Sequence, residues 1–197
     1  MKQLGFILSI VLLLIVVPVL LAQASAGEER QLHGVRLHET SYEEISYTNQ
    51  AQEIELGGML FLPQGAGAYP AVVIIHGSGT SKRDNRWYLA MTQYLQENGI
   101  AVLLPDKRGS EKSSGSWHGA SFEDLATDTV AAVDYLKTRH DLPISHIGII
   151  GMSQGGHIAP TAAGLSPDIS FLIDVTGAAV PIREQLLFEE NNNLREM

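Results

Sequence analysis

The stretch IIGMSQGGH, residues 149–157, joins a short apolar run to a serine flanked by glycines. The apolar run has no polar alternation and is too short for a helix, which is typical of a strand buried on both faces. The residues that follow match G-x-S-x-G, a pattern that turns a strand sharply into a helix because the flanking positions lack a Cβ atom. Such a turn exposes the serine Oγ. We therefore interpret Ser153 as a candidate nucleophile, with a structural turn serine as the alternative.

Short apolar runs alternate with helix-like segments through most of the chain. We expect strands at residues 71–75, 100–104, 146–150 and 170–175, and helices at residues 86–98, 121–139 and from the serine turn to about residue 165. This alternation predicts parallel strand–helix–strand units with right-handed crossovers. The expected fold class is therefore α/β, with a mostly parallel, doubly wound sheet. Pro160 is expected to bend or shorten the last helix because it has no N–H group.

The segments on either side of the first parallel strand carry more local patterns. Residues 42–48 and 52–62 read as an antiparallel hairpin at the N-terminal side, with Gly57 and Gly58 marking a bulge or turn. In the helix at residues 86–98, three- and four-residue spacing predicts one buried face. That face would carry Trp87, Met91, Tyr94 and Leu95.

Three unusual loops follow the predicted parallel strands and should meet at one edge of the sheet, where ligands bind in such folds. These loops contain His76, Asp106 and Ser153. A serine nucleophile needs two N–H donors for the oxyanion that develops on the acyl group. We expect the first donor from the backbone of Gln154 and the second from Ser78. Gly77 and Gly79 flank Ser78 and would let the backbone approach a substrate closely. An ordinary glycine-rich connection is the alternative for this second loop.

Three motifs give the chain a family resemblance. They read HGSG at residues 76–79, PDKRG at residues 105–109 and GMSQGG at residues 151–156. With them the chain resembles the α/β-hydrolases, in particular the bacterial group related to serine aminopeptidases and dienelactone-hydrolase-like esterases. The resemblance spans residues 71–175 and implies hydrolysis of an ester, amide or peptide bond without a cofactor. The second motif of this group often continues as D-x-R-G-x-G-x-S, and Glu111 stands here where the later glycine would be.

The resemblance also implies a histidine base and a carboxylic acid, on loops that follow the nucleophile. Only 44 residues follow Ser153, and residues 181–197 read as the start of a lid or insertion helix. We therefore expect a hydrolase domain that is truncated at its C-terminus and lacks its catalytic histidine and acid.

Some histidines that are present have other expected roles. His157 lies four residues after Ser153, but on a helix that leaves the turn it points away from the Oγ, which favours a packing or lining role over that of a base. His118, in a Ser- and Gly-rich loop, is the other candidate base. His76 is expected to orient its own loop. His140 and His146 are expected at the opposite end of the sheet, with structural roles.

Two carboxylates are candidates for supporting roles. Asp174, at the end of the fourth parallel strand, is the candidate acid, and the alternative is an aspartate that caps the following loop. Asp106 is expected to organise its loop beside Arg108 rather than to act as a catalytic acid.

The chain of 197 residues, with 45% hydrophobic and 18% charged residues, is long enough for one globular domain. We expect four segments, namely a signal peptide at residues 1–26, a linker at 27–40, a partial hydrolase domain at 41–180 and the lid or insertion helix at 181–197. Lys2, a long apolar run and two A-x-A sites favour a cleaved leader. An uncleaved membrane anchor is the alternative. In both cases the domain would lie outside the cytoplasm, secreted or periplasmic.

Composition narrows the classes of partner. Without the leader the chain has 12 basic and 22 acidic residues, and a net charge of about −10 repels nucleic acid. The sequence contains no cysteine, and no carboxylates cluster with His33 and His38, so we expect no metal and no cofactor. The expected partner is a small-molecule ester or peptide substrate, with membrane contact only through an uncleaved N-terminus. A hydrolase-like binding or interaction module that no longer turns over is the alternative function.

Overall fold

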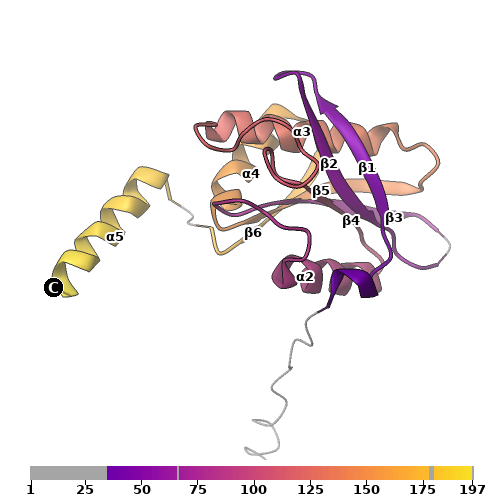
Figure 1. Cartoon of the computed structure of the whole chain (residues 1–197), viewed down its shortest axis with the longest axis horizontal. Helices are drawn as coiled ribbons and strands as arrows, with labels where there is room; N and C mark the ends of the chain where they lie inside the picture. The colour runs from indigo at the N-terminus through magenta and orange to yellow at the C-terminus, as the bar shows by residue number, and fades with distance from the viewer. Residues whose placement is uncertain (1–34, 66, 178–179, 197) are drawn as a thin grey trace, which may run out of the picture. The chain divides into compact units, whose positions relative to one another are not determined.

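The computed structural model describes residues 35–65, 67–177 and 180–196, and within them six strands form one mixed sheet in the order β1-β2-β4-β3-β5-β6 (Figure 1). β3, β4, β5 and β6 are parallel, and β1 and β2 join the sheet through antiparallel pairing. This arrangement confirms the expected α/β class and the N-terminal hairpin. The strands are β1 (Glu43–Asn49), β2 (Ile54–Phe61), β3 (Tyr69–Ile75), β4 (Ala101–Pro105), β5 (Ile144–Met152) and β6 (Ile169–Val175).

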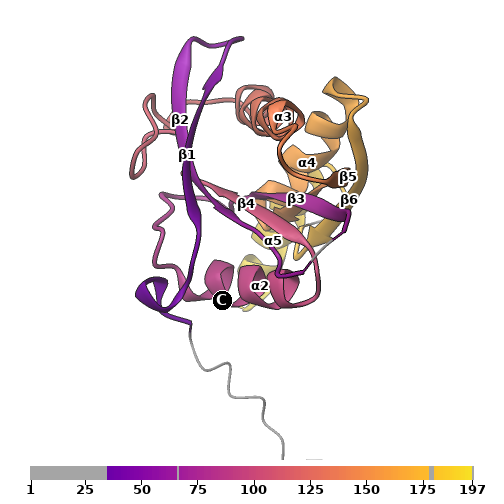
Figure 2. The same ribbon diagram turned by 90° about the vertical axis from the view of Figure 1, so that its right-hand side faces the viewer.

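Helices cover both faces of the sheet (Figure 2). The helices of the described residues are η1 (Leu37–Glu39), α2 (Arg86–Glu97), α3 (Phe122–Thr138), α4 (Gln154–Leu165) and α5 (Ile182–Glu196). α2 packs on the face that carries Val72 and Ile74 of β3. α3 and α4 pack on the other face, which carries Val73 and Ile75. Successive side chains of a strand point to opposite faces, so β3 needs an unbroken apolar run to fill two cores.

The buried face of α2 differs from the predicted one. Leu89 is fully buried, whereas Trp87 is 73% exposed and Tyr94 is 61% exposed. Tyr88, Met91 and Leu95 complete the contact with the sheet. Apolar residues occur all around this helix, so their spacing could not show which face meets the sheet. Asn85 begins the helix by accepting hydrogen bonds from two backbone N–H groups, and Gly99 follows its end with φ +80°.

The hairpin also differs in one detail, because Gly57 and Gly58 form neither a bulge nor a turn. Both pair in register with β1, opposite Ser46 and Ile45. A Cβ atom on Gly57 would lie 2.8 Å from Oδ2 of Asp106. The glycine is therefore needed because the loop after β4 lies directly against the hairpin.

The helices next to the serine turn follow the sequence closely. Ser121 and Asp124, spaced as S-x-x-D in the sequence, form a capping box at the start of α3. α4 continues through Pro160 to Leu165, so the proline does not shorten it. The predicted leader, and the part of the predicted linker up to residue 34, lie outside the described residues. Among the residues that the structure does describe, no helix is long and apolar enough to cross a membrane.

Candidate active site

Ser153 occupies a sharp turn between the end of β5 and the start of α4. Its backbone has φ 52° and ψ −115°, a conformation that L-residues rarely adopt. The Ser153 N–H donates to the carbonyl of Val175 at 3.0 Å, and its carbonyl accepts from Gly156 at 2.8 Å. The residue is exposed to solvent. This is the strained, outward-pointing turn that the sequence predicts.

Close backbone approach explains the glycines around Ser153. A Cβ atom on Gly151 would lie 2.4 Å from the carbonyl oxygen of Gly155, and one on Gly155 would lie 2.3 Å from the carbonyl oxygen of Ile75. A Cβ on Gly156 would meet Oδ1 of Asp174 at 2.3 Å. The turn thus lies against the ends of both neighbouring strands, β3 and β6.

The loop that follows β3 lies beside the serine. A Cβ atom on Gly77 would be 3.5 Å from the Cβ of Ser153. Among the described residues, the backbone N–H groups of Ser78 and Gln154 have no hydrogen-bond acceptor. The two expected oxyanion donors are therefore available on loops that flank Ser153, and their role in catalysis stays a prediction.

His76 is buried and holds its loop in place. Its Nε2 lies 2.6 Å from the carbonyl oxygen of Pro105, and its Nδ1 lies 2.9 Å from Oγ of Ser81. A carbonyl can only accept, so Nε2 carries the proton and Nδ1 accepts from the serine hydroxyl. The ring also packs edge-on against Tyr88 at 4.5 Å. Burial lowers the pKa of His76 to about 4, so the ring is neutral at neutral pH.

We expect His76 to make the protein sensitive to acid. Its pKa is about 4 in the folded protein against 6.5 for the free side chain, so the unfolded chain binds more protons between these values. The stability that the neutral ring provides is full above pH 6.5 and is lost as the pH falls toward 4. Long-range proton–nitrogen NMR spectra should show His76 protonated only on Nε2 at about pH 5.5. A ring that is doubly protonated at that pH would contradict the expected burial.

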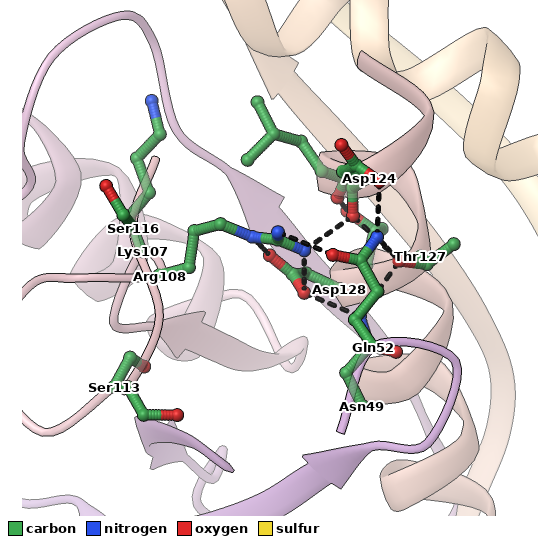
Figure 3. Close-up of polar contacts among 12 residues, drawn as sticks. Asn49, Gln52, Lys107, Arg108, Ser113, Ser116, Asp124, Thr127 and Asp128 are labelled. Carbon is green, nitrogen blue, oxygen red and sulfur yellow. Dashed lines mark hydrogen bonds and ion pairs between the residues drawn. The ribbon is translucent and has the colours of Figure 1, made fainter. Parts of the chain in front are cut away.

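Asp106 and Arg108 organise their loop through partners other than each other. Both carboxylate oxygens of the buried Asp106 accept from the guanidinium of Arg83, at 2.9 and 2.7 Å. Arg108 instead donates to Asp128 of α3 at 2.6 and 2.8 Å and to Gln52 of the hairpin turn at 2.7 Å (Figure 3). Asp106 therefore makes its loop-organising contacts with Arg83 and not with the neighbouring Arg108.

Glu111 takes the conformation that the missing glycine would provide. Its φ is +48°, in the left-handed region. Two residues later, Ser113 donates from Oγ to the carbonyl oxygen of Asp106 at 2.7 Å and accepts from the N–H of Gly57 at 2.9 Å. The loop therefore closes against the hairpin although a glutamate occupies the glycine position.

Lys107 was missed by the sequence analysis, which treated it as a variable position within the second motif. Its Nζ donates to the carbonyl oxygen of Gly77 at 2.7 Å and to Oε1 of Gln154 at 3.2 Å. The ammonium also lies 5.1 Å from the centre of the Trp117 ring. Burial lowers the pKa of Lys107 to about 8. No sequence signal marks this residue, because its partners lie on two other loops.

The remaining candidates lie away from the serine hydroxyl or have other partners. Oδ1 of Asp174 accepts from the N–H of Gly177 at 2.9 Å, which is the capping contact of the alternative interpretation. Nε2 of His157 contacts Oε1 of Gln185 at 2.8 Å. His118 stacks on Trp117 with ring centres 3.9 Å apart. His140 and His146 line a hollow of about 450 Å³ at the other end of the sheet. In the described part of the chain, Ser153 Oγ has no hydrogen-bond partner.

A family model described as serine aminopeptidase, S33, matches residues 68–194, which include all three motifs. The chain belongs to this hydrolase family. It is 31% identical over 113 residues to Esterase EstD of Thermotoga maritima, covering 55% of this chain and 27% of the relative. It is also 31% identical over 117 residues to Dipeptidyl aminopeptidase BIII of Pseudoxanthomonas mexicana, covering 55% of this chain and 16% of the relative.

The fold of this family is that of solved α/β-hydrolases. The crystal structure of Alpha/beta hydrolase GrgF from Penicillium matches with a TM-score of 0.60 at 23% identity, covering 80% of this chain and 54% of the fungal one. The chain thus spans only about half of this solved relative and a smaller part of the two curated ones. The expected hydrolase class and the resemblance are confirmed.

No metal centre is evident in the described segments. Within them, no three His, Cys, Asp or Glu side chains come together in a way that would hold a metal ion.

Proposed function

We propose that this family member is an exported serine hydrolase that cleaves an ester, amide or peptide bond through an acyl-serine intermediate. One observation carries the proposal: Ser153 is exposed at a strained turn, and the N–H groups of Gln154 and Ser78 beside it have no acceptor among the described residues. The names of the relatives, an esterase and a dipeptidyl aminopeptidase, support both bond types. Export rests on the charged and apolar N-terminal sequence.

The proposed reaction begins when Ser153 Oγ attacks the acyl carbon and loses its proton to a general base. The negative oxygen of the tetrahedral intermediate accepts hydrogen bonds from the N–H groups of Gln154 and Ser78. The intermediate collapses to the acyl-serine, and the alcohol or amine leaves with the proton. Water then attacks the acyl carbon and releases the acid. The base and the acid that orients it would come from residues outside those described.

A fluorophosphonate provides the test, because it forms a stable bond with an activated serine. We expect intact-mass analysis to show one slow adduct on the folded wild-type chain and none on Ser153→Ala. In serine hydrolases that lack the catalytic histidine or acid, the oxyanion hole and substrate binding still accelerate the reaction roughly 10³- to 10⁴-fold over the reaction in water. Added imidazole should then accelerate labelling by replacing the base.

A control variant, a urea-unfolded sample and a series of imidazole concentrations make this test decisive. Ser116→Ala, a change in an exposed loop residue, should label like the wild type. If the wild type gains no adduct at Ser153, or labels equally after urea unfolding, the serine is not the nucleophile. A rate that is independent of imidazole would contradict the proposed absence of the base.

A second candidate is a hydrolase-like binding module without turnover. His157, the nearest histidine after the serine in the chain, contacts Gln185 rather than the serine hydroxyl. This function predicts no labelling of Ser153 with or without imidazole.

A further inference from the structure

Lys107 lies between the loop after β3 and the start of α4, which carry the two proposed oxyanion donors. Its ammonium contacts the carbonyl oxygen of Gly77 on one side and the side-chain amide oxygen of Gln154 on the other. The side chain is directed away from the network of the neighbouring Arg108 (Figure 3). The residue is only 7% exposed, so this charge is largely withdrawn from water. Burying an ammonium is unfavourable unless hydrogen bonds replace those to water, and both hydrogen-bond acceptors of Lys107 lie on the segments that carry the proposed donors.

The contact with Gly77 bears directly on Ser78, because the carbonyl of Gly77 and the N–H of Ser78 belong to one peptide group. A trans peptide is planar, with C=O and N–H pointing in opposite directions. When Lys107 fixes the direction of this carbonyl, it also fixes the direction of the Ser78 N–H. A cation on the carbonyl oxygen draws electron density from the peptide and strengthens its N–H as a donor.

The other side of the same loop is held independently. The N–H of Gly77 donates to Oη of Tyr88 at 2.9 Å, and Tyr88 packs against the ring of His76. The Gly77–Ser78 peptide is therefore fixed at its carbonyl by Lys107 and at the preceding N–H by Tyr88. Only the N–H of Ser78 is left without an acceptor in the described residues, as a preorganised donor requires.

We propose that Lys107 is a positioning residue of the oxyanion hole, whose ammonium orients and polarises the Gly77–Ser78 peptide and links it to Gln154. The inference rests on the proposed function for its catalytic consequence. The structural part of the inference, which is the orientation of the Ser78 N–H, does not depend on the proposed function.

Several charged and titratable groups lie around the Lys107 ammonium. His76, at the end of β3, is neutral because burial lowers its pKa to about 4. Asp106 is paired with Arg83, and Arg108 is paired with Asp128. The Trp117 ring lies 5.1 Å from the ammonium, and the His118 ring packs against Trp117. Burial lowers the Lys107 pKa from 10.5 to about 8, so its charge is present at pH 7 and is lost as the pH rises past about 8.

The test compares the wild type with Lys107→Met and Lys107→Arg, using the fluorophosphonate labelling rate of Ser153 across pH. We expect Lys107→Met to slow labelling at pH 7 by about 10-fold or more, a part of the roughly 10²- to 10³-fold effect of losing one oxyanion donor. Lys107→Arg should restore part of the rate because it keeps the charge. Above about pH 9, the ratio of wild-type to Met-variant rates should approach one. Lys112→Met, in the same loop with a largely exposed side chain, should behave as the wild type.

Other outcomes overturn the proposal. A rate ratio near one at pH 7 would mean that Lys107 has no influence on the serine. A ratio that stays constant with pH would indicate that the side chain only fills space. A ratio that grows above pH 8 would indicate that neutral Lys107 acts as a base instead.

A second readout does not depend on labelling and distinguishes the two proposals. In Ser153→Ala, the amide proton and nitrogen shifts of Ser78 should change with pH around the Lys107 pKa of about 8. This change should disappear in Ser153→Ala/Lys107→Met. If the wild type fails to label but the Ser78 shift titrates, the proposed function fails and the positioning role stands. If the shift does not titrate, the positioning role fails.

Discussion

Gly155→Ala is expected to reduce the free energy of unfolding by about 3 kcal/mol or more, because overpacking of this kind has to displace backbone. The added Cβ would lie 2.3 Å from the carbonyl oxygen of Ile75 and 3.1 Å from that of His76. Neither atom belongs to a flexible side chain, so relief requires β3 to move away from α4. The same movement would separate the loop after β3 from Ser153. Urea unfolding followed by circular dichroism measures the loss of stability.

Gly164→Ala is the matched control in the same helix. A Cβ atom at Gly164 would meet nothing within 4 Å, and the residue is exposed. There the substitution should leave stability unchanged or raise it by up to about 1 kcal/mol, since alanine favours the helix. If Gly155→Ala unfolds at the same urea concentration as Gly164→Ala, then β3 and α4 do not approach as closely as the structure indicates. Reduced labelling of Ser153 in Gly155→Ala is the expected functional counterpart.

The parts of the fold that the sequence predicts well are those governed by local rules. The apolar run at residues 71–75 could only be a doubly buried strand, and the structure confirms it as part of β3. The serine turn could be predicted because the positions that flank the serine by two residues must lack a Cβ atom for the turn to form. The capping box of Ser121 and Asp124 is equally local. Each of these patterns places its cause and its effect in the same short segment.

The errors and omissions have a common physical origin in contacts between distant segments. Gly57 indicated a bulge or turn in the sequence, but the structure requires glycine there because Asp106 approaches it from another loop. Arg83, which pairs with Asp106, and Gly77, which accepts from Lys107, both lie more than 20 residues away from these partners. The spacing of residues in the sequence does not reveal such contacts, because a charged side chain could pair with any of several oppositely charged residues. Tertiary structure alone decides which of them it meets.

The family match adds what the sequence patterns could not establish. Short motifs indicate a serine turn and a glycine-rich loop, and the family match over residues 68–194 shows that the chain belongs to a hydrolase family. The likeness to solved structures below 25% identity extends only to the fold. The roles of individual residues in this chain therefore depend on its own geometry and on the experiments proposed above.

The pairing of Arg108 with Asp128 is expected to contribute strongly to stability. The side chain of Arg108 is 6% exposed and that of Asp128 is 16% exposed. Arg108 joins the loop after β4 to the hairpin turn and to the first turns of α3 (Figure 3). Asp128→Ala would leave the guanidinium buried without its carboxylate, which typically costs about 3–5 kcal/mol. We expect a loss of that size in urea unfolding at neutral pH.

Asp168→Ala is the control, because it removes an ion pair between α3 and the segment before β6 that is well exposed on both sides. Lys137 and Asp168 have side chains that are 46% and 39% exposed, so this change should cost no more than about 1 kcal/mol. The double variant Arg108→Met/Asp128→Leu should be more stable than Asp128→Ala alone, since it leaves no buried charge unpaired. If the two single variants lost equal stability, Arg108 would be solvated, and the loop carrying Lys107 would not be held against α3. The oxyanion loop depends on that anchor, because Lys107 reaches Gly77 from the residue directly before Arg108.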